Sequence, residues 1–227
     1  MINFRIDPAL GQPHVPSGTE LDFCEGHALI SVVGFRFLNT RVRGFAIPFH
    51  RHFDEVNLRF YVRREDPRHD PRRGVVFVRE IVPRRAIAIV ARLGYNEPYV
   101  SLPMRSSTPA PGASVPGQIE YAWKAAGGWN RITASAAGAP SVAGPGDPAA
   151  FVTERYWGYT RQRNGRTIEY EVLHPRWRLW HADEATLDLG GGTLYGGELD
   201  AALSAPPWLA LIADGSAVSV SAPRRLI

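Results

Sequence analysis

Polar side chains of three kinds alternate with apolar ones in the stretch FDEVNLRFYV, residues 53–62. Side chains along a strand alternate between its faces, so Glu55, Asn57 and Arg59 share one face. If that face lines a closed cavity, burial raises the pKa of Glu55 and fits it for proton transfer, while Arg59 opposes the shift or holds an anion. The alternative is a half-exposed strand whose polar face meets water, where a Glu–Arg pair contributes under about 1 kcal/mol.

A second group of reactive side chains lies in YNEPYVSLPMR, residues 95–105, which holds two tyrosines, an acid and an arginine between prolines. A rigid aromatic loop of this kind can form the roof of a pocket, or equally plug the end of a barrel. We expect Arg59 or Arg105 to bind an anionic group and Tyr95 or Tyr99 to form a pocket wall. The candidate residues are, for catalysis, Glu55, Arg59, Tyr95 and Glu97 and, for binding, Asn57, Tyr99, Met104 and Arg105.

Metal and cofactor chemistry have little support in this sequence. His50 and His52 share a strand face, and Asp54 or Glu55 could add a carboxylate, but no third ligand is evident and the flanking phenylalanines fit a packed turn equally well. There is no phosphate loop, dinucleotide fingerprint or nucleophile elbow. Cys24 has no basic neighbour to lower its pKa, so it is not expected to act as a nucleophile. We therefore expect no metal and no cofactor.

The basic residues are almost all arginine. Lys124 is the single lysine among the 26 basic residues, so Schiff-base chemistry would have to use Lys124 or the N-terminal amine. The formal net charge is +4, but the arginines are scattered, and their pairs at 63–64, 72–73 and 84–85 fall in expected turns. Nucleic-acid binders usually gather basic residues on one face, so we expect no nucleic-acid partner.

The composition indicates a cytoplasmic protein. No apolar run approaches the ~20 residues needed to span a bilayer, and the N-terminus lacks the layout of a secretory signal, so we expect no membrane partner. A single cysteine agrees with a reducing compartment. The six tryptophans leave room for an apolar interface, so a homo-oligomer is compatible with the composition.

The elements that must position these residues are mainly strands. The 227 residues suit one mainly-β domain with a few short helices, and the hairpin pattern indicates an antiparallel sandwich or barrel. The expected elements are a strand at 23–37 bulged near Gly34, strands at 55–62 and 75–82 joined by a solvated loop at 64–74, a helix at 83–93, hairpins 119–124/129–134 and 151–161/167–174, a short helix within 197–204, and a closing hairpin 209–212/217–221.

Several motifs in order resemble a known family. The segments VGFRFLNTRVRG, FDEVNLRFYV, RRGVVFVRE, YNEPYVSLPM, TERYWGYT and LHPRWRLWHADEA resemble the DUF2071 (YqjF-like) family of bacterial proteins over nearly the whole chain. That family is grouped with acetoacetate decarboxylase, so the resemblance implies a single domain over residues 1–227, folded as a cone-shaped antiparallel β barrel that encloses a cavity.

The resemblance does not carry the decarboxylase chemistry with it. In that enzyme a lysine forms a Schiff base, whereas the matching loop here, residues 95–99, holds no lysine. A cavity glutamate of the decarboxylase corresponds to Glu55, which supports an inward-facing Glu55. The enzyme also uses an arginine ahead of its first strand. This chain begins too late to supply one, and the resemblance leaves open whether the natural N-terminus lies upstream of Met1.

Together these features lead to one functional hypothesis and one alternative. The hypothesis is a cytoplasmic barrel that binds a small molecule, such as an organic acid, and could act as a lyase-like or hydrolase-like enzyme on a carbonyl or carboxylate compound without a Schiff base. The alternative is a non-catalytic ligand sensor or structural protein in which the same polar face is a satisfied hydrogen-bond network. The sequence leaves open whether the protein is an enzyme.

Overall fold

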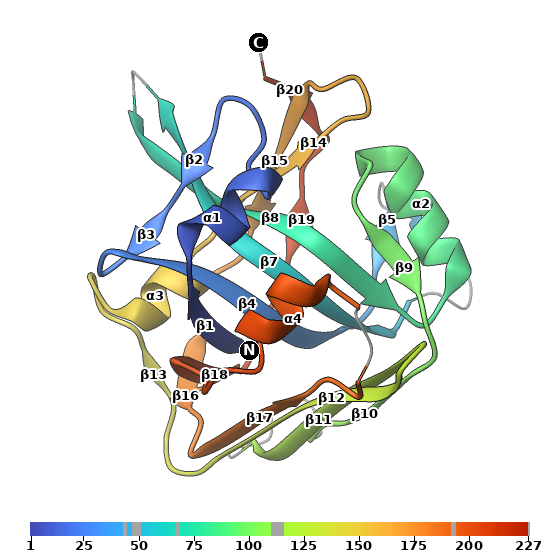
Figure 1. The fold of residues 1–227 in the computed structure, drawn as a ribbon, viewed down its shortest axis with the longest axis vertical. Coiled ribbons are helices and arrows are strands. Elements are labelled where there is room, and N and C mark those ends of the chain that lie inside the picture. Colours follow the sequence, from blue (N-terminus) through green and yellow to red (C-terminus); the bar gives the residue numbers. More distant parts are fainter. Residues whose placement is uncertain (43–44, 47–50, 67–68, 110–115, 192–193, 227) are drawn as a thin grey trace.

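The computed structural model describes residues 1–42, 45–46, 51–66, 69–109, 116–191 and 194–226. This part of the chain is mainly β, with a large bent sheet, a four-stranded sheet on one side of it and short helices around both (Figure 1). In spatial order the main path of the large sheet is β13 (Ser141–Val142), β16 (Arg178–His181), β18 (Leu209–Ala213), β1 (Ile2–Ile6), β4 (His27–Phe37), β7 (Phe53–Asp66), β8 (His69–Val82), β14 (Trp157–Arg161), β15 (Thr167–Leu173) and β19 (Ser219–Val220).

Shorter strands and the helices complete the described fold. Beside the main path lie β2 (Glu20–Leu21), β3 (Phe23–Cys24), β9 (Tyr99–Ser101) and β20 (Arg224–Arg225). The second sheet consists of β10 (Met104–Ser107), β11 (Gly117–Ala125), β12 (Gly128–Ala136) and β17 (Glu184–Asp188), and β5 (Arg41–Val42) pairs with β6 (Phe45–Ala46). The helices are α1 (Pro8–Gly11), the 3-10 helix η1 (Gln12–His14), α2 (Arg85–Tyr95), α3 (Pro148–Thr153) and α4 (Gly197–Ala202).

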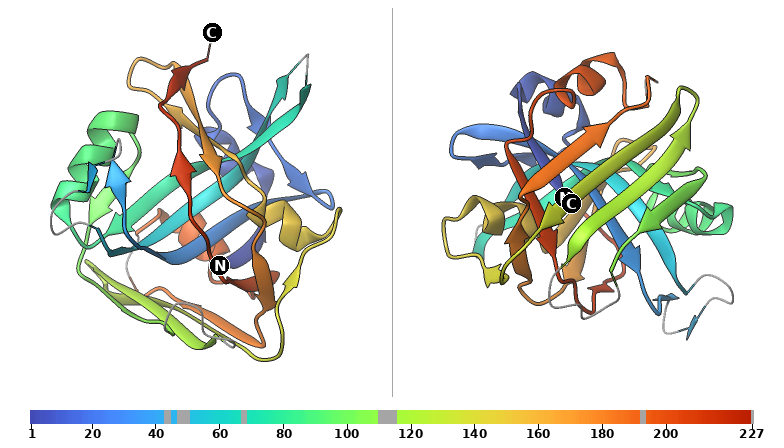
Figure 2. Two further views of the ribbon diagram at one scale, coloured as in Figure 1. Left: turned by 180° about the vertical axis from the view of Figure 1, so that it is seen from behind. Right: turned by 90° about the horizontal axis from the view of Figure 1, so that it is seen from below.

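The apolar face of β7 is covered by the second sheet. Val56, Leu58 and Phe60 are buried in one cluster with Tyr121 and Trp123 of β11, and Figure 2 shows the second sheet lying across the large one. The opposite face carries Glu55, Asn57, Arg59 and Tyr61, so the predicted alternation is confirmed. This second face is the one that positions the candidate site.

The bulge predicted near Gly34 lies elsewhere. The pairing of β4 with β7 runs in register through Gly34 and Val56. The pairing of β7 with β8 shifts register twice, between Leu58 and Arg59 and between Arg64 and Asp66. A Cβ on Gly34 would come 2.7 Å from the Tyr121 ring. Gly34 is therefore needed for close approach of the two sheets rather than for a bulge.

The predicted strand at 151–161 is wrong in its first half. Residues Pro148–Thr153 form α3, whose N-cap Asp147 accepts a hydrogen bond from the Ala149 amide at 2.8 Å, with Pro148 in the first turn. β14 begins only at Trp157. The apolar residues of this segment pack as one side of a helix against the sheet instead of alternating along a strand.

The predicted solvated loop at 64–74 is also mostly strand. β7 runs to Asp66 and β8 begins at His69, because the two strands remain paired as far as Asp66 and His69. Arg64 and Arg72 both form ion pairs with Glu169 of β15. The helix predicted at 83–93 is confirmed as α2, as are the hairpin of β11 with β12 and the short helix α4.

The predicted closing hairpin does not form. β18 pairs with β1 and β16, and β19 pairs with β15, so the two segments lie in different parts of the sheet. The sheet is also not purely antiparallel, because β8 pairs in parallel with both β14 and β9. These two parallel pairings shape the site described below.

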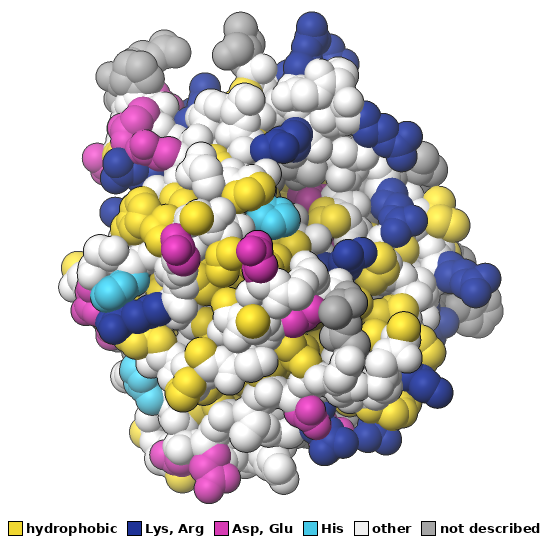
Figure 3. All heavy atoms as spheres, in the orientation of Figure 1, with side chains coloured by type: hydrophobic (Ala, Val, Ile, Leu, Met, Phe, Trp, Pro, Cys, Tyr) yellow, Lys and Arg dark blue, Asp and Glu magenta, His cyan; other side chains and the backbone are white. Residues whose placement is uncertain are grey.

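On the face shown in Figure 3 most basic side chains lie toward the right and upper parts, while several acidic side chains lie nearer the centre among apolar groups. None of the helices in the described part of the chain is both long and apolar enough to cross a bilayer.

Candidate functional site

Glu55 of β7 is buried, with 1% of the residue exposed. Tyr99 Oη donates a hydrogen bond to Glu55 Oε2 at 2.9 Å, and Asn57 Nδ2 donates to Oε1 at 3.3 Å. Asn57 lies two residues along the same strand face, whereas Tyr99 comes from β9. The alternative of a polar face that meets water is therefore wrong for Glu55.

A second glutamate, Glu80 of β8, lies on the same face and is 3% exposed. The antiparallel register places Glu80 opposite Asn57, and the parallel register places it beside Tyr99. Asn57 and Tyr99, which both donate hydrogen bonds to Glu55, are therefore also the residues that pair with Glu80 in the sheet. Burial raises the pKa of Glu80, and the charges of Glu97 and then Glu55 raise it further.

A third glutamate, Glu97, lies between α2 and β9 and is 5% exposed. Its Oε1 accepts hydrogen bonds from Tyr170 Oη of β15, at 2.7 Å, and from Thr160 Oγ1 of β14. The Tyr170 ring lies across its strand partner Gly158, where a Cβ would overlap the ring. A glycine at this position therefore allows the tyrosine to reach Glu97.

All three carboxyl groups have raised pKa values because they are removed from water. Burial raises the pKa of Glu55 to about 7, although hydrogen bonds from Tyr99 and Asn57 favour the ionised form. Burial also raises the pKa of Glu97 to about 7, against its two hydroxyl donors. The pKa of Glu80 is raised well above its ordinary value, first by burial and then by the charges of Glu97 and Glu55. Near neutral pH the three carboxyl groups are therefore not all ionised at once.

Several acceptor atoms of the cluster have no hydrogen-bond partner among the described residues. These are Oε2 of Glu80, Oε2 of Glu97 and Oδ1 of Asn57. Within the same part of the chain, no arginine or lysine forms an ion pair with Glu55, Glu80 or Glu97. Buried polar atoms in proteins are nearly always paired, so side chains of the described residues alone do not satisfy this cluster.

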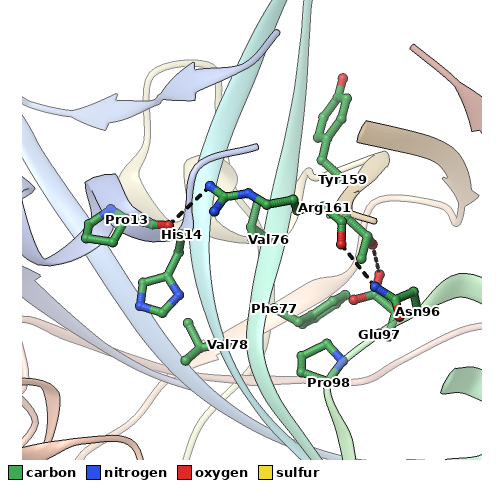
Figure 4. A pocket seen from close by; sticks show the side chains of 11 residues that line it. Pro13, His14, Val76, Phe77, Val78, Asn96, Glu97, Pro98, Tyr159 and Arg161 are labelled. Atoms are coloured by element: carbon green, nitrogen blue, oxygen red, sulfur yellow. Dashed lines mark hydrogen bonds between the residues drawn. The ribbon is translucent and has the colours of Figure 1, made fainter. Parts of the chain in front are cut away.

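A cavity lies at a break in the sheet and is lined by one member of the cluster, Glu97. β8 pairs with β14 at Gly74 and Val75 and with β9 from Glu80 to Val82, and in the described pairings its edge between them has no neighbour. An open cavity of about 240 Å³ lies at this break (Figure 4). Its lining includes His14, Val76, Val78, Glu97, Pro98 and Thr160. Glu97 thus belongs both to the buried cluster and to a cavity open to solvent.

Two of the predicted catalytic residues take other positions. Arg59 lies four residues from Glu55, and in an extended strand this separates the two by roughly 13 Å along the face. Its Nη2 donates to the Val152 carbonyl at 3.0 Å. Tyr95 Oη donates to the Ser221 carbonyl at 3.3 Å, and its ring packs edge-on against Tyr170 at 5.2 Å. Tyr95 therefore supports a residue of the site, and the structure does not bring Arg59 to Glu55.

Met104 and Arg105 lie on the second sheet. Met104 packs into the core between the sheets. The Arg105 side chain is 54% exposed and stacks 4.6 Å from the Trp129 ring, with Glu120 at 3.9 Å. The chain leaves the large sheet after β9, so the structure does not bring these two residues to Glu55 or Glu97. The predicted anion clamp at Arg59 or Arg105 is not formed.

Of the two histidines considered as metal ligands, the structure describes one. His50 lies outside the described residues, and His52 is exposed, with its Nδ1 accepting from the Asn39 amide at 3.3 Å. In the described part of the chain, no three His, Cys, Asp or Glu side chains are placed to hold a metal ion. Lys124 is exposed on β11 of the second sheet.

Sequence reasoning missed Glu80, Thr160 and Tyr170. Glu80 carried a usable signal, because it lies on the strand that returns from Glu55 and an antiparallel register could have been drawn between them. Thr160 and Tyr170 reach Glu97 over 63 and 73 residues of chain. No local pattern marks such distant partners.

Comparison with known proteins shows the family and the fold of this chain. Residues 1–217 match the DUF2071 family, described as "Uncharacterized conserved protein". The chain belongs to the DUF2071 family. It is 30% identical over 185 residues to "Uncharacterized protein YqjF" of Bacillus subtilis (strain 168), an alignment that covers 80% of this chain and 72% of that relative. The resemblance drawn from the sequence motifs is confirmed.

Solved structures show the fold of this DUF2071 protein. An acetoacetate decarboxylase-like enzyme from Sphingomonas wittichii RW1 matches with a TM-score of 0.67 at 15% identity, over 99% of this chain and 89% of that one. The enduracididine biosynthesis enzyme MppR complexed with pyruvate matches with a TM-score of 0.63 at 16% identity, over 92% and 80% of the two chains. The mainly-β, acetoacetate decarboxylase-like fold is thereby confirmed.

Proposed function

We propose that this DUF2071 protein binds a small carbonyl compound beside Glu55 and that Glu55 transfers a proton to or from it without a Schiff base. The observation that carries the proposal is the Glu55 carboxyl group, which is buried, oriented by Tyr99 and Asn57, and has a pKa of about 7. A general acid or base works best with a pKa near the working pH. The pyruvate complex of MppR supports a small oxo compound as the ligand class.

The proton transfer can be written with this chain's own groups. Ionised Glu55 takes a proton from the carbon next to the carbonyl. The electron pair of that C–H bond forms a carbon–carbon double bond, and the π pair of the carbonyl moves to its oxygen, which gives an enolate. Glu80, whose raised pKa keeps it protonated, donates a hydrogen bond to that oxygen. The reverse step returns the proton. An amine is not required, and the loop at 95–99 contains none.

The test is proton exchange in D2O, followed by NMR on hydroxyacetone and pyruvate. The wild-type protein is expected to replace the hydrogens next to the carbonyl by deuterium faster than buffer does, and Glu55→Gln is expected to lower the rate about 100-fold. Glu184→Gln, at an exposed position of β17, is the matched control and should retain the wild-type rate.

Two results would contradict the proposed proton transfer by Glu55. Exchange no faster than buffer with both compounds, or full exchange in a folded Glu55→Gln protein, contradicts proton transfer by Glu55. A thermal shift with these compounds that requires Glu55 but is not accompanied by exchange would identify the ligand sensor. In that case the site binds but does not react.

A further inference from the structure

Glu97 carries a feature that the proton transfer at Glu55 does not use. Its Oε1 accepts two hydroxyl hydrogen bonds, while its Oε2 has no partner among the described residues although the residue is only 5% exposed. It also lines the cavity at the break in the sheet (Figure 4). Resting on the proposed function, we infer that the ligand carries a cationic nitrogen, an ammonium or guanidinium group, and that Glu97 binds it.

Among the described residues, the two buried acids outside the glutamate cluster, Asp22 and Glu169, are each paired with arginine inside the protein. Asp22, 3% exposed, binds Arg155 at 2.5 Å. Glu169, 5% exposed, binds both Arg64 at 3.1 Å and Arg72 at 2.9 Å. A buried carboxylate without a counter-ion is costly, which is why these two have arginines. Glu97 differs, since its neighbours are the acids Glu55 and Glu80.

The cationic groups around the cavity are occupied elsewhere. Arg161 lines it, but its Nη2 donates to the carbonyls of Pro13 at 3.2 Å and Val15 at 2.7 Å (Figure 4). His14 also lines it, and its pKa is lowered by burial and then by Arg161, so near neutral pH it is uncharged. The cationic partner of Glu97 is therefore expected to come from the ligand.

An organic nitrogen fits this position better than a metal ion. Within the described residues no cluster of three ligating side chains is placed to hold a metal. A cationic N–H needs only one or two acceptor oxygens at hydrogen-bond distance, and Oε2 of Glu97 supplies one. A cavity of about 240 Å³ also limits the ligand to a small compound. A small amino-carbonyl compound meets both conditions.

Three probes of nearly equal size test the charge: aminoacetone, hydroxyacetone and pyruvate, which are cationic, neutral and anionic carbonyl compounds. Calorimetric titration at pH 6.5 should show aminoacetone binding at least about 10-fold more tightly than hydroxyacetone, with pyruvate weakest, because a charge-assisted hydrogen bond contributes about 1.5–3 kcal/mol. Glu97→Gln should abolish the preference for aminoacetone and leave hydroxyacetone within about 3-fold. Glu184→Gln should change neither affinity.

A second measurement needs no variant. Glu97 must ionise to hold a cation, so aminoacetone binding to the wild-type protein should strengthen from pH 5.5 to 7 and release protons, seen by repeating the titration in buffers of different ionisation enthalpy. Other titratable groups face Glu97 or line its cavity. Tyr99 and Tyr170 have raised pKa values that keep their hydroxyl groups protonated, and the pKa of Glu80 is also raised. Glu55, with a pKa of about 7, titrates in the same range, and His14 and Arg161 line the cavity.

The outcomes separate this inference from the proposed function. Hydroxyacetone or pyruvate binding as tightly as aminoacetone, with exchange that still depends on Glu55, overturns the cationic ligand and leaves the proton transfer intact. Proton uptake on aminoacetone binding also overturns it. If none of the three probes binds or exchanges, both the proposed function and this inference are wrong.

Discussion

At the scale of single residues, the three glutamates differ through their neighbours. Glu55 and Glu97 each receive two hydrogen bonds, which offset part of the effect of burial on their pKa values. Burial raises the pKa of Glu80 well above its ordinary value, and the charges of both other acids raise it further. Identical side chains can thus take different roles, with Glu80 as a hydrogen-bond donor and Glu55 as a base.

The stability of the protein should fall as pH rises through this range. For Glu55 the pKa is about 7 when folded and 4.5 when exposed, so between these values the folded state binds more protons and loses stability as the pH increases. In urea unfolding at pH 5 and pH 8, the free energy of unfolding should fall between the two pH values. The fall should be smaller in Glu55→Gln by on the order of 3 kcal/mol.

Glu184→Gln is the control for that measurement and should keep the wild-type pH dependence. An unfolding free energy that is equal or higher at pH 8 in the wild-type protein would contradict the raised pKa of Glu55. So would a Glu55→Gln variant with an unchanged slope.

At the scale of elements, the hairpin of β14 and β15 presents Tyr170 and Thr160 to Glu97. Gly158 is the position where the Tyr170 ring crosses β14. The same strand pairs with β8 only at Gly74 and Val75, which leaves the break that contains the cavity. One hairpin therefore supplies both the hydroxyl donors of the site and one side of its entrance.

Gly158→Ala is expected to displace the Tyr170 ring and weaken its hydrogen bond to Glu97. Overpacking of this kind costs about 1–3 kcal/mol, measured by urea unfolding, and should also lower the exchange rate in D2O. Gly94→Ala, in α2, is a suitable control because its Cβ would meet no atom within 4 Å and a helix favours alanine. A Gly158→Ala protein as stable as the wild type would show that the ring is free to move.

At the scale of the whole molecule, segments from both ends of the chain lie in one sheet. β1 pairs with β18, and the buried Asn3 side chain donates to the Leu209 carbonyl at 2.8 Å. Asn3 also accepts from Ser31 Oγ of β4 at 2.6 Å. Such pairing between distant segments is expected to make the molecule unfold as one unit, as a single domain over residues 1–227 requires.

This cooperativity can be measured by comparing two probes. Urea unfolding followed by far-UV circular dichroism and by tryptophan fluorescence should give the same midpoint. Asn3→Ala should lower the unfolding free energy by about 2 kcal/mol in both, because it leaves buried partners unpaired. Two separate midpoints, or a change seen by only one probe, would contradict a single domain.

The sequence by itself determined the local part of this protein. The alternation around Glu55 placed its carboxyl group and Asn57 on one face, because it depends only on residues close in the chain. The α2 helix and the β11–β12 hairpin followed for the same reason. The family followed from several short motifs and their order, which can be read without knowing any contact between them. The local pattern led to a wrong prediction at α3, because its apolar residues fit a strand as well as a helix.

Only the tertiary structure decided which groups meet Glu55. Glu80 and Tyr99 arrive through strand register, and Tyr170 reaches Glu97 from 73 residues away. Arg59 shares the face of Glu55 but lies too far along the strand, and Arg105 crosses to the other sheet. Strand pairing is set by the packing of the entire chain, so the composition of the site, three acids without a cation from the described residues, could not be obtained from local pattern.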